Sequence, residues 1–308
     1  MATYQHYVPR FYLKGFLDPL SVGVKKLKPY LWVVDLKNKK IKNRSPKNIA
    51  GRAGYYDLLS LNPEYRSVLE RIYSRTENHA RQVIHQLQNQ QFQLSLQDRA
   101  DLSNFIGLQL TRVPIYRQYM NIRFNEVLAE RFQEVLADEN RLHQRLGEHA
   151  KWFKEYVQTR KPKPYLKFES EDHKRDFATL SSFFAGYDYY AGLAFSRIWM
   201  FVLAEEVSTF FTSDNPVSLL SPDSKSIKID FNGRNEFLEI VFPISSSCAL
   251  LMHAHYKHPN IHSAEVVTVN EKAVIELNRR RLPTVGRLIF CSSEKQAKLV
   301  LSQSQIAI

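Results

Sequence analysis

Helix-like and strand-like patterns occupy separate stretches of this 308-residue chain. From about residue 63 to 204, apolar residues recur close to every 3.6 positions, which predicts helices. From 205 to 308, short apolar runs are separated by turn residues, which predicts strands. Because a parallel α/β sheet needs strands that alternate with helices, this segregation favours an α+β fold. We expect one domain, 1–308, with a helical body closed by a mostly antiparallel or mixed C-terminal sheet.

Residues 1–62 carry separate signals. QHYVPRFYLKGF is dense in aromatic and aliphatic residues, although chain ends are usually frayed. Pro9 favours an extended residue before it and a short helix after it. The runs LWVVDL and KIKNRS flank a polar turn, which is typical of a hairpin. We therefore expect a docked N-terminal segment followed by a hairpin.

Two helix boundaries stand out in the middle of the chain. Ser95 with Asp98 three residues later is typical of a helix start, and Pro114 separates that helix from the next one. A further long apolar helix is expected from Ser170 to about residue 204, with an interruption near Gly186.

Positive charge is concentrated near the N-terminus. The chain has a net charge of +12, and residues 1–60 hold twelve Lys or Arg against three Asp. Such a field favours a polyanionic partner, with nucleic acid first; the alternative is a solvated surface that is merely basic. Lys39, Lys40 and Lys42 in the expected hairpin are candidate contacts to such a partner.

Several classes of protein are excluded or disfavoured. The sequence has no GxxxxGK[ST] and no GxGxxG, so the common phosphate-binding loops are absent. No signal peptide is visible, and charged residues interrupt the most apolar stretch, so we expect a cytoplasmic protein without a membrane partner. Cys248 and Cys291 lie in apolar runs and are expected to be buried thiols in a reducing compartment.

Three motifs together suggest a family. QHYVPRFYLKGF, FIGLQLTRVP, and FFTSDNPV followed by FPIS resemble domain of unknown function 4238, a mainly bacterial family with an N-terminal histidine-tyrosine-valine-proline signature. The resemblance extends from His6 to about Ser292 and implies no particular reaction. It points to the motif residues His6, Pro9, Gln109, Arg112, Pro114, Ser213, Asp214, Pro216 and Pro243.

The N-terminal motif supplies the first candidate site residues. His6 and Arg10 lie four residues apart across a helix start. A histidine can transfer a proton near neutral pH, and an arginine can bind a phosphate or carboxylate with two hydrogen bonds. The alternative is that His6 caps the short helix and Arg10 forms a surface ion pair.

The C-terminal motif supplies Ser213 and Asp214, which come where a predicted strand ends in a turn. Asp214 could orient His6, accept a proton or bind a metal. Asp-Asn-Pro is also a good turn sequence, in which the carboxylate bonds backbone. Ser213 is a candidate substrate contact rather than a nucleophile, because no nucleophile-elbow spacing surrounds it.

The predicted helices add ionisable groups. Glu70 and Glu77 lie two turns apart, roughly on one helix face, and a buried carboxylate there needs a partner such as Arg112 or Arg10. A carboxylate–arginine pair could be catalytic or purely structural. Gln109 and Arg112 close an otherwise apolar helix, where the helix dipole alone favours a cation, and an anionic substrate is the alternative.

A metal site is a weaker expectation. MHAHYKHPNIH carries His253, His255, His258 and His262, and two of them share a strand face. No glutamate follows at the spacing of a metallohydrolase, so the sequence assigns no metal ligands. Whether a cofactor such as a divalent cation is required stays open.

These features lead to two hypotheses and one bland alternative. The first is a nuclease- or phosphodiesterase-like hydrolase that acts on nucleic acid or another phosphate-containing substrate, with phage defence as one expected role. His6, Arg10, Glu77, Arg112 and Asp214 would form its catalytic site. The second is a non-catalytic module that binds nucleic acid or a protein through the basic N-terminal region. The bland alternative is a subunit that depends on a protein partner encoded nearby, of undetermined oligomeric state.

Overall fold

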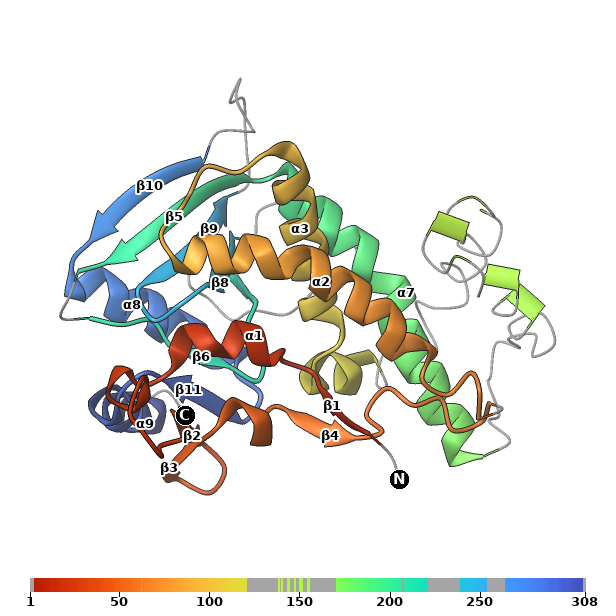
Figure 1. Cartoon of the computed structure of the whole chain (residues 1–308), viewed down its shortest axis with the longest axis horizontal. Coiled ribbons are helices and arrows are strands. Elements are labelled where there is room, and N and C mark those ends of the chain that lie inside the picture. Colours follow the sequence, from red (N-terminus) through yellow and green to blue (C-terminus); the bar gives the residue numbers. More distant parts are fainter. Residues whose placement is uncertain are drawn as a thin grey trace.

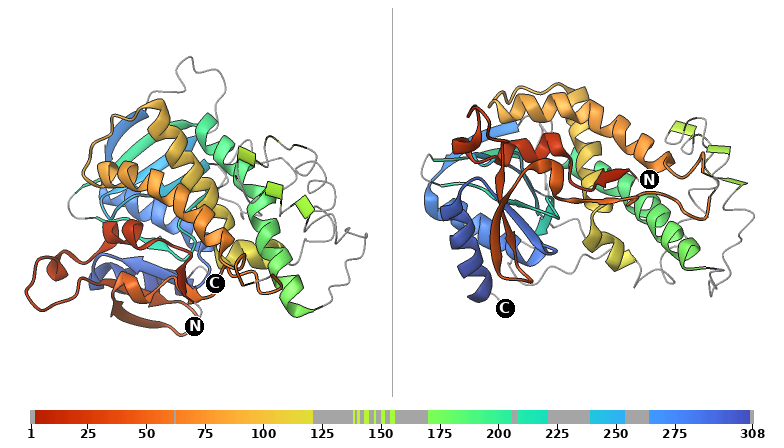
Figure 2. Two further views of the ribbon diagram at one scale, coloured as in Figure 1. Left: turned by 45° about the vertical axis from the view of Figure 1, so that its right-hand side comes forward. Right: turned by 60° about the horizontal axis from the view of Figure 1, so that its bottom comes forward.

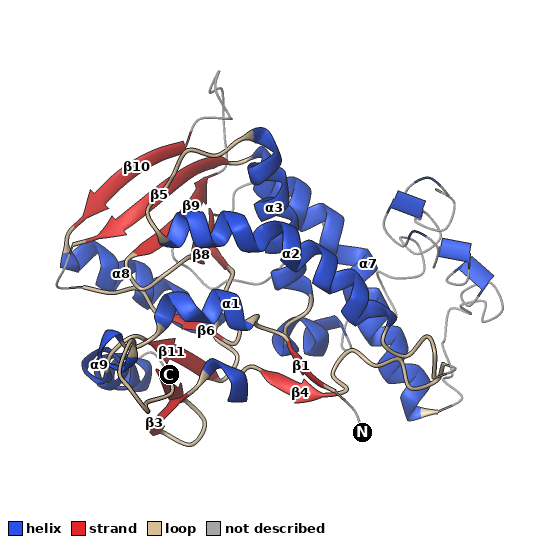
Figure 3. Ribbon diagram, in the orientation of Figure 1, coloured by secondary structure: helices blue, strands red, loops and turns tan. Residues whose placement is uncertain are grey.

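The computed structural model describes residues 3–61, 63–120, 170–205, 208–220, 239–253 and 264–306, together with isolated residues between 138 and 155. These residues form helices, a two-stranded sheet and two larger sheets, so the fold is α+β, as the sequence predicts (Figures 1 and 3). No helix in these described ranges is both long enough and apolar enough to span a bilayer.

The N-terminal region forms two small β elements around a short helix. β1 pairs antiparallel with β4, and β2 with β3 form the predicted hairpin. The elements are β1 (Tyr4–His6), α1 (Arg10–Leu13), β2 (Leu31–Asp35), β3 (Lys40–Arg44) and β4 (Gly51–Ala53).

Three helices form the body beside the sheets: α2 (Val68–Gln88), α3 (Leu96–Thr111) and α7 (Glu171–Ser196). Ser95 and Asp98 form the predicted capping box at the start of α3. Gly107 lets α3 approach α7 closely, because a Cβ there would lie 2.6 Å from the Tyr187 carbonyl oxygen. This contact joins two helices that are far apart in sequence.

A five-stranded mixed sheet in the order β10-β5-β9-β8-β7 lies against the helices (Figure 1). β10 is parallel to β5, and the other pairs are antiparallel. The strands are β5 (Ile198–Ala204), β7 (Ser218–Leu220), β8 (Glu239–Pro243), β9 (Cys248–His253) and β10 (Ala264–Val269).

Both faces of this sheet are covered by apolar side chains. Trp199 and Phe201 of β5 point into the core shared with α2, α3 and α7. Val202 lies in a second core on the opposite face, with Val274 and Leu277 of α8 (Glu271–Arg281). The expected continuation of the helix to residue 204 is therefore wrong: α7 ends at Ser196 and β5 follows. A strand buried on both faces has a continuous apolar run, which periodicity cannot distinguish from a buried helix.

A four-stranded sheet in the order β3-β2-β11-β6 joins the N-terminal hairpin to C-terminal strands. Its remaining strands are β6 (Thr212–Ser213) and β11 (Leu288–Cys291), and α9 (Glu294–Ile306) packs on it. Cys248 and Cys291 are buried free thiols, as expected, and lie in different sheets.

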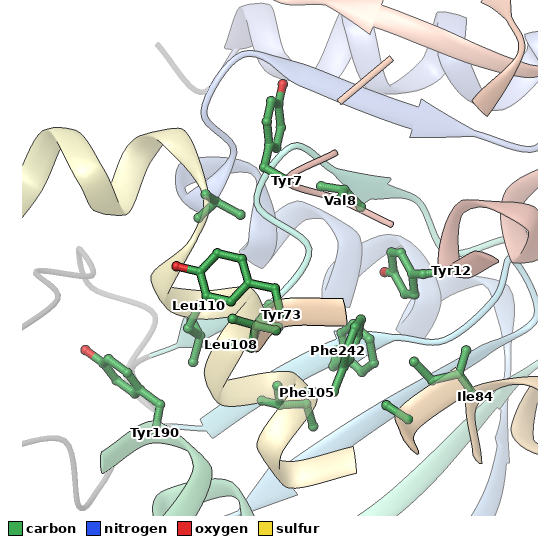
Figure 4. Close-up of a cluster of buried hydrophobic side chains, with 14 of the residues drawn as sticks. Tyr7, Val8, Tyr12, Tyr73, Ile84, Phe105, Leu108, Leu110, Tyr190 and Phe242 are labelled. Carbon is green, nitrogen blue, oxygen red and sulfur yellow. The ribbon is translucent and has the colours of Figure 1, made fainter. Parts of the chain in front are cut away.

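Tyr12 fixes the N-terminal segment in the core. Its ring stacks on Phe242 with centroids 5.1 Å apart (Figure 4). Its hydroxyl donates to the Pro243 carbonyl oxygen and contacts the Thr212 hydroxyl, each at 2.7 Å. One side chain thus joins α1 to a strand of each larger sheet, and the expectation of a docked N-terminal segment is confirmed.

Replacing Tyr12 with Phe should lower the free energy of unfolding by about 2 kcal/mol, because the buried Pro243 carbonyl and Thr212 hydroxyl lose a partner. Urea unfolding at neutral pH would measure the change. Tyr30→Phe is the control, since Tyr30 is only half-buried and no hydrogen bond of its hydroxyl is part of this network. Equal stabilities of the two variants would contradict this role for Tyr12.

Candidate functional site

A chain of polar contacts runs from the N-terminal segment through α3 to α2. Gln109 Nε2 donates to the Tyr7 carbonyl oxygen at 2.8 Å, and Gln109 Oε1 accepts from Arg112 Nε at 2.9 Å. Arg112 Nη1 donates to Glu77 Oε1 at 2.6 Å. Arg112 Nη2 also donates to Gln109. We call Tyr7, Gln109, Arg112 and Glu77 the anchoring network.

Arg112 is enclosed at the end of α3, where its side chain is 1% exposed and Glu77 is 20% exposed. Burial is the largest single influence on the pKa of Arg112 and lowers it, but the charge of Glu77, its hydrogen bond and the neighbouring Tyr56 and Glu70 together outweigh burial and raise the pKa. Arg112 therefore stays charged and holds Glu77 in place. The described hydrogen bonds of the Arg112 guanidinium go to Glu77 and Gln109. Arg112 therefore acts as a positioning residue rather than as a residue that binds an anionic substrate.

His6 is the last residue of β1 and is half-buried. Its Nε2 lies 3.2 Å from the Lys47 carbonyl oxygen, so in the neutral ring Nε2 carries the proton and Nδ1 is the basic atom. Burial is the largest influence on His6 and lowers its pKa below the usual value. The charge of Arg10 lowers the pKa further, while the charge of Glu77 raises it. The histidine is consequently neutral at pH 7.

Arg10 begins α1 and is exposed, close enough to His6 for its charge to influence the ring. The predicted alternative, in which His6 caps the helix, is not observed, because Pro9 holds the N-cap position without a side-chain cap. Arg10 is therefore available to a negatively charged ligand beside a neutral imidazole.

Glu70 was predicted to share a helix face with Glu77, but it was not among the candidate catalytic residues. It lies two turns before Glu77 on α2, partly buried. Burial, followed by repulsion from Glu77, raises its pKa to about 7, although Arg112 opposes the shift. A carboxyl that is about half protonated at neutral pH can donate a proton. The shared face of Glu70 and Glu77 was the signal in the sequence.

Asp214 lies in a different environment, in the turn after β6. Its Oδ1 accepts from the Gly286 backbone N–H at 3.0 Å, and its Oδ2 accepts from those of Arg287 and Leu288 at 2.8 and 3.0 Å. Burial raises its pKa to about 6 even though these three N–H groups oppose the shift. Neither oxygen bonds His6 among the described contacts, so the expected role of orienting the histidine does not match the geometry.

Gly286 makes this arrangement possible, since a Cβ there would lie 3.1 Å from both carboxylate oxygens of Asp214. Ser213 is fully buried, and its hydroxyl donates to the Asn215 carbonyl oxygen at 2.7 Å. Ser213 thus stabilises the turn that follows β6, and Asp214 joins this turn to the backbone that leads into β11. The geometry favours the turn interpretation of this motif over substrate contact by Ser213.

The three candidate lysines lie on the exposed hairpin. Lys39 occupies the turn with φ 51°, and Lys40 and Lys42 are on β3, the edge strand of its sheet. Alternation along β3 sends Lys40, Lys42 and Arg44 to one side, while Ile41 packs toward α9. These cations form a solvent-facing row apart from the anchoring network.

The histidine-rich segment is only partly described. His253 Nδ1 lies 3.1 Å from Glu239 Oε1, whereas His255, His258 and His262 lie outside the described residues. Within the described ranges no three His, Cys, Asp or Glu side chains gather as a metal site would require. The structure thus adds no support for the metal expectation.

The contacts place the candidate residues at three locations. Gln109, Arg112 and Glu77 are joined by hydrogen bonds, the charges of Arg10 and Glu77 reach His6, and Glu70 is linked to this group through the charges of Glu77 and Arg112. Ser213 and Asp214 belong to the end of β6 and the turn that follows it, and the hairpin lysines form a third location. Tyr7 connects the first two, since burial and then the charge of Asp214 raise its pKa, while its carbonyl receives Gln109.

Arg112→Ala should lower the free energy of unfolding by about 3–5 kcal/mol, because Glu77 and Gln109 lose their partner inside the protein. Thermal and urea unfolding would measure it. Arg279→Ala is the matched control: Arg279 also pairs with a glutamate, Glu276, but both side chains are about half exposed, so little change is expected. Equal effects would show that the Arg112 network is not the anchor.

Comparison with known proteins adds family membership. No curated protein and no solved structure matches the chain. A family model described as "Protein of unknown function (DUF4238)" matches residues 4–295, which include every element from β1 to β11. The chain therefore belongs to the DUF4238 family, as its N-terminal, central and C-terminal motifs indicate.

Proposed function

We propose that this protein is a hydrolase of a phosphate-containing substrate, and that it acts at the group formed by His6, Arg10, Glu70 and Glu77. The observation that carries the proposal is a base, His6, and an acid, Glu70, that are both partly buried and both lie within reach of the charge of Glu77. Burial favours neutral His6 and raises the pKa of Glu70 to about 7. Environments that shift two titratable groups in this way are typical of acid–base sites.

Each group has a role in this proposal. The exposed guanidinium of Arg10 binds the phosphate oxygens with paired hydrogen bonds. His6 Nδ1 takes a proton from water as the water oxygen bonds to phosphorus. The bond from phosphorus to the leaving oxygen then breaks, and protonated Glu70 gives its proton to that oxygen. His6 returns its proton to solvent and Glu70 regains one.

Glu77 and the anchoring network act as positioning groups. The Glu77 carboxylate, fixed by Arg112, raises the pKa of both His6 and Glu70 toward the working range. Gln109 holds the Tyr7 backbone next to His6. Cleavage of nucleic acid by such a site would suit the predicted role in phage defence, with the basic hairpin as an additional contact.

Hydrolysis of a thymidine dinucleotide, a phosphodiester whose alkoxide leaving group needs a proton as it departs, tests this assignment. Its rate should rise as pH passes the lowered pKa of His6, since the base must lose its proton. It should fall above about pH 7, since Glu70 then loses the proton that it donates. His6→Ala and Glu70→Gln should each reduce kcat by about 100-fold or more, and Glu70→Gln should also remove the fall at alkaline pH.

His79→Ala is the matched control for His6, because His79 lies on α2 with its side chain 69% exposed. Melting temperatures of all three variants separate loss of activity from loss of folding. No hydrolysis by the wild type, or an unchanged rate in His6→Ala, would refute the acid–base site. A parallel loss of activity and stability in His6→Ala would assign that residue to structure.

A second candidate function is supported by the row of exposed cations on β3. Single-stranded nucleic acid could bind there without being cleaved, because its phosphates would meet Lys39, Lys40 and Lys42 on a solvent-facing edge.

Charge reversal at Lys39, Lys40 and Lys42 should abolish binding of a fluorescent single-stranded oligonucleotide, and wild-type binding should weaken steeply with added salt, since each phosphate contact releases counterions. Fluorescence anisotropy over a salt titration measures both effects. Charge reversal at Lys272, Lys295 and Lys298, exposed lysines on α8 and α9, is the control. Binding that survives the hairpin substitutions and high salt would rule out this electrostatic surface.

A further inference from the structure

An exposed loop between α1 and β2 presents unusually many aliphatic side chains to solvent. Leu20 is 81% exposed, Val22 54%, Val24 49% and Leu27 43%. These four make up half of the large hydrophobic residues that are exposed in the described part of the chain. We call residues 19–28 the apolar loop, and it projects from the body of the protein (Figure 2, left). A cluster of this kind marks an interaction surface more often than scattered surface leucines do.

The base of the apolar loop is fixed, so its exposure is built into the fold. Asp18 is buried; its Oδ1 accepts from the Leu20 backbone N–H at 2.9 Å and its Oδ2 from Trp32 Nε1 at 2.7 Å. The Asp18 backbone N–H donates to the Tyr30 carbonyl oxygen at 2.8 Å. Ser21 Oγ accepts from the Tyr30 backbone N–H at 3.1 Å. These contacts hold both ends together while the tip stays open.

The tip is also positively charged. Lys25, Lys26 and Lys28 are exposed, and residues 19–28 contain no Asp or Glu. None of these lysines pairs with an acid among the described salt bridges. The loop therefore combines aliphatic side chains with unneutralised ammonium groups within ten residues.

We propose that the apolar loop docks on an anionic lipid bilayer. Aliphatic side chains next to lysines can enter the interface between headgroups and acyl chains, while the ammonium groups bind acidic headgroups. Nucleic acid fits the loop less well, because base stacking requires aromatic residues and the loop has none.

This surface is independent of the proposed hydrolase site and of the hairpin lysines. The hairpin row contains cations without exposed aliphatic neighbours in the described part of the chain. The two basic surfaces thus differ in whether exposed aliphatic side chains accompany the lysines. Lipid insertion requires such side chains and simple charge attraction does not, so the hairpin lysines serve as the control.

Co-sedimentation with vesicles tests the proposal. The wild type should bind vesicles of phosphatidylcholine mixed with phosphatidylserine, and bind pure phosphatidylcholine vesicles at least about tenfold more weakly. Reversing Lys25, Lys26 and Lys28 to Glu should reduce binding by about 100-fold. Replacing Leu20, Val22 and Val24 with Ser should reduce it by at least about tenfold with the charge unchanged.

The matched control reverses Lys39, Lys40 and Lys42, which changes the net charge by the same amount and should leave most of the binding. In a Val22→Trp variant, indole fluorescence should shift to shorter wavelength only with anionic vesicles. Absence of binding would overturn the proposal. So would equal losses from the two lysine sets together with no effect of the serine substitutions, which would indicate non-specific charge attraction.

Discussion

A buried guanidinium decides how the N-terminal half of this protein is arranged. Arg112 ends α3 in the interior, and removing it from water is costly unless a carboxylate and further acceptors meet it. Glu77 of α2 and Gln109 of α3 supply them, and the second polar group of Gln109 reaches the Tyr7 carbonyl. The contacts that satisfy this charge therefore also hold Tyr7, the neighbour of His6, against α3.

The sheets reinforce that arrangement from the other side. The side chain of Tyr12 extends from α1, stacks on Phe242 of β8 and forms a hydrogen bond with Thr212 of β6. The segment that carries His6 and Arg10 is therefore held at both ends. A segment fixed in this way can present a half-buried imidazole with a lowered pKa, which a frayed terminus could not do. The same rigidity lets the apolar loop, a few residues further on, extend from a fixed base.

Much of the local structure was predictable. The capping box at Ser95, the β2–β3 hairpin and the buried thiols depend on short-range patterns, and all are confirmed. β5 was missed because both of its faces are covered, which removes the alternation that identifies a strand. Glu70 was not selected because its raised pKa depends on burial and on Glu77 together, and spacing alone shows neither its degree of burial nor its charged neighbours.

The sequence by itself determined the segregation of helices and strands, the basic N-terminal region and the motifs of the family, because composition, periodicity and turn residues are local properties. Only the tertiary structure decided that Arg112 pairs with Glu77, that Asp214 is occupied by three backbone N–H groups, and that the aliphatic residues after α1 stay in solvent. These outcomes depend on which segments distant in sequence remove one another from water, and no local pattern encodes that choice.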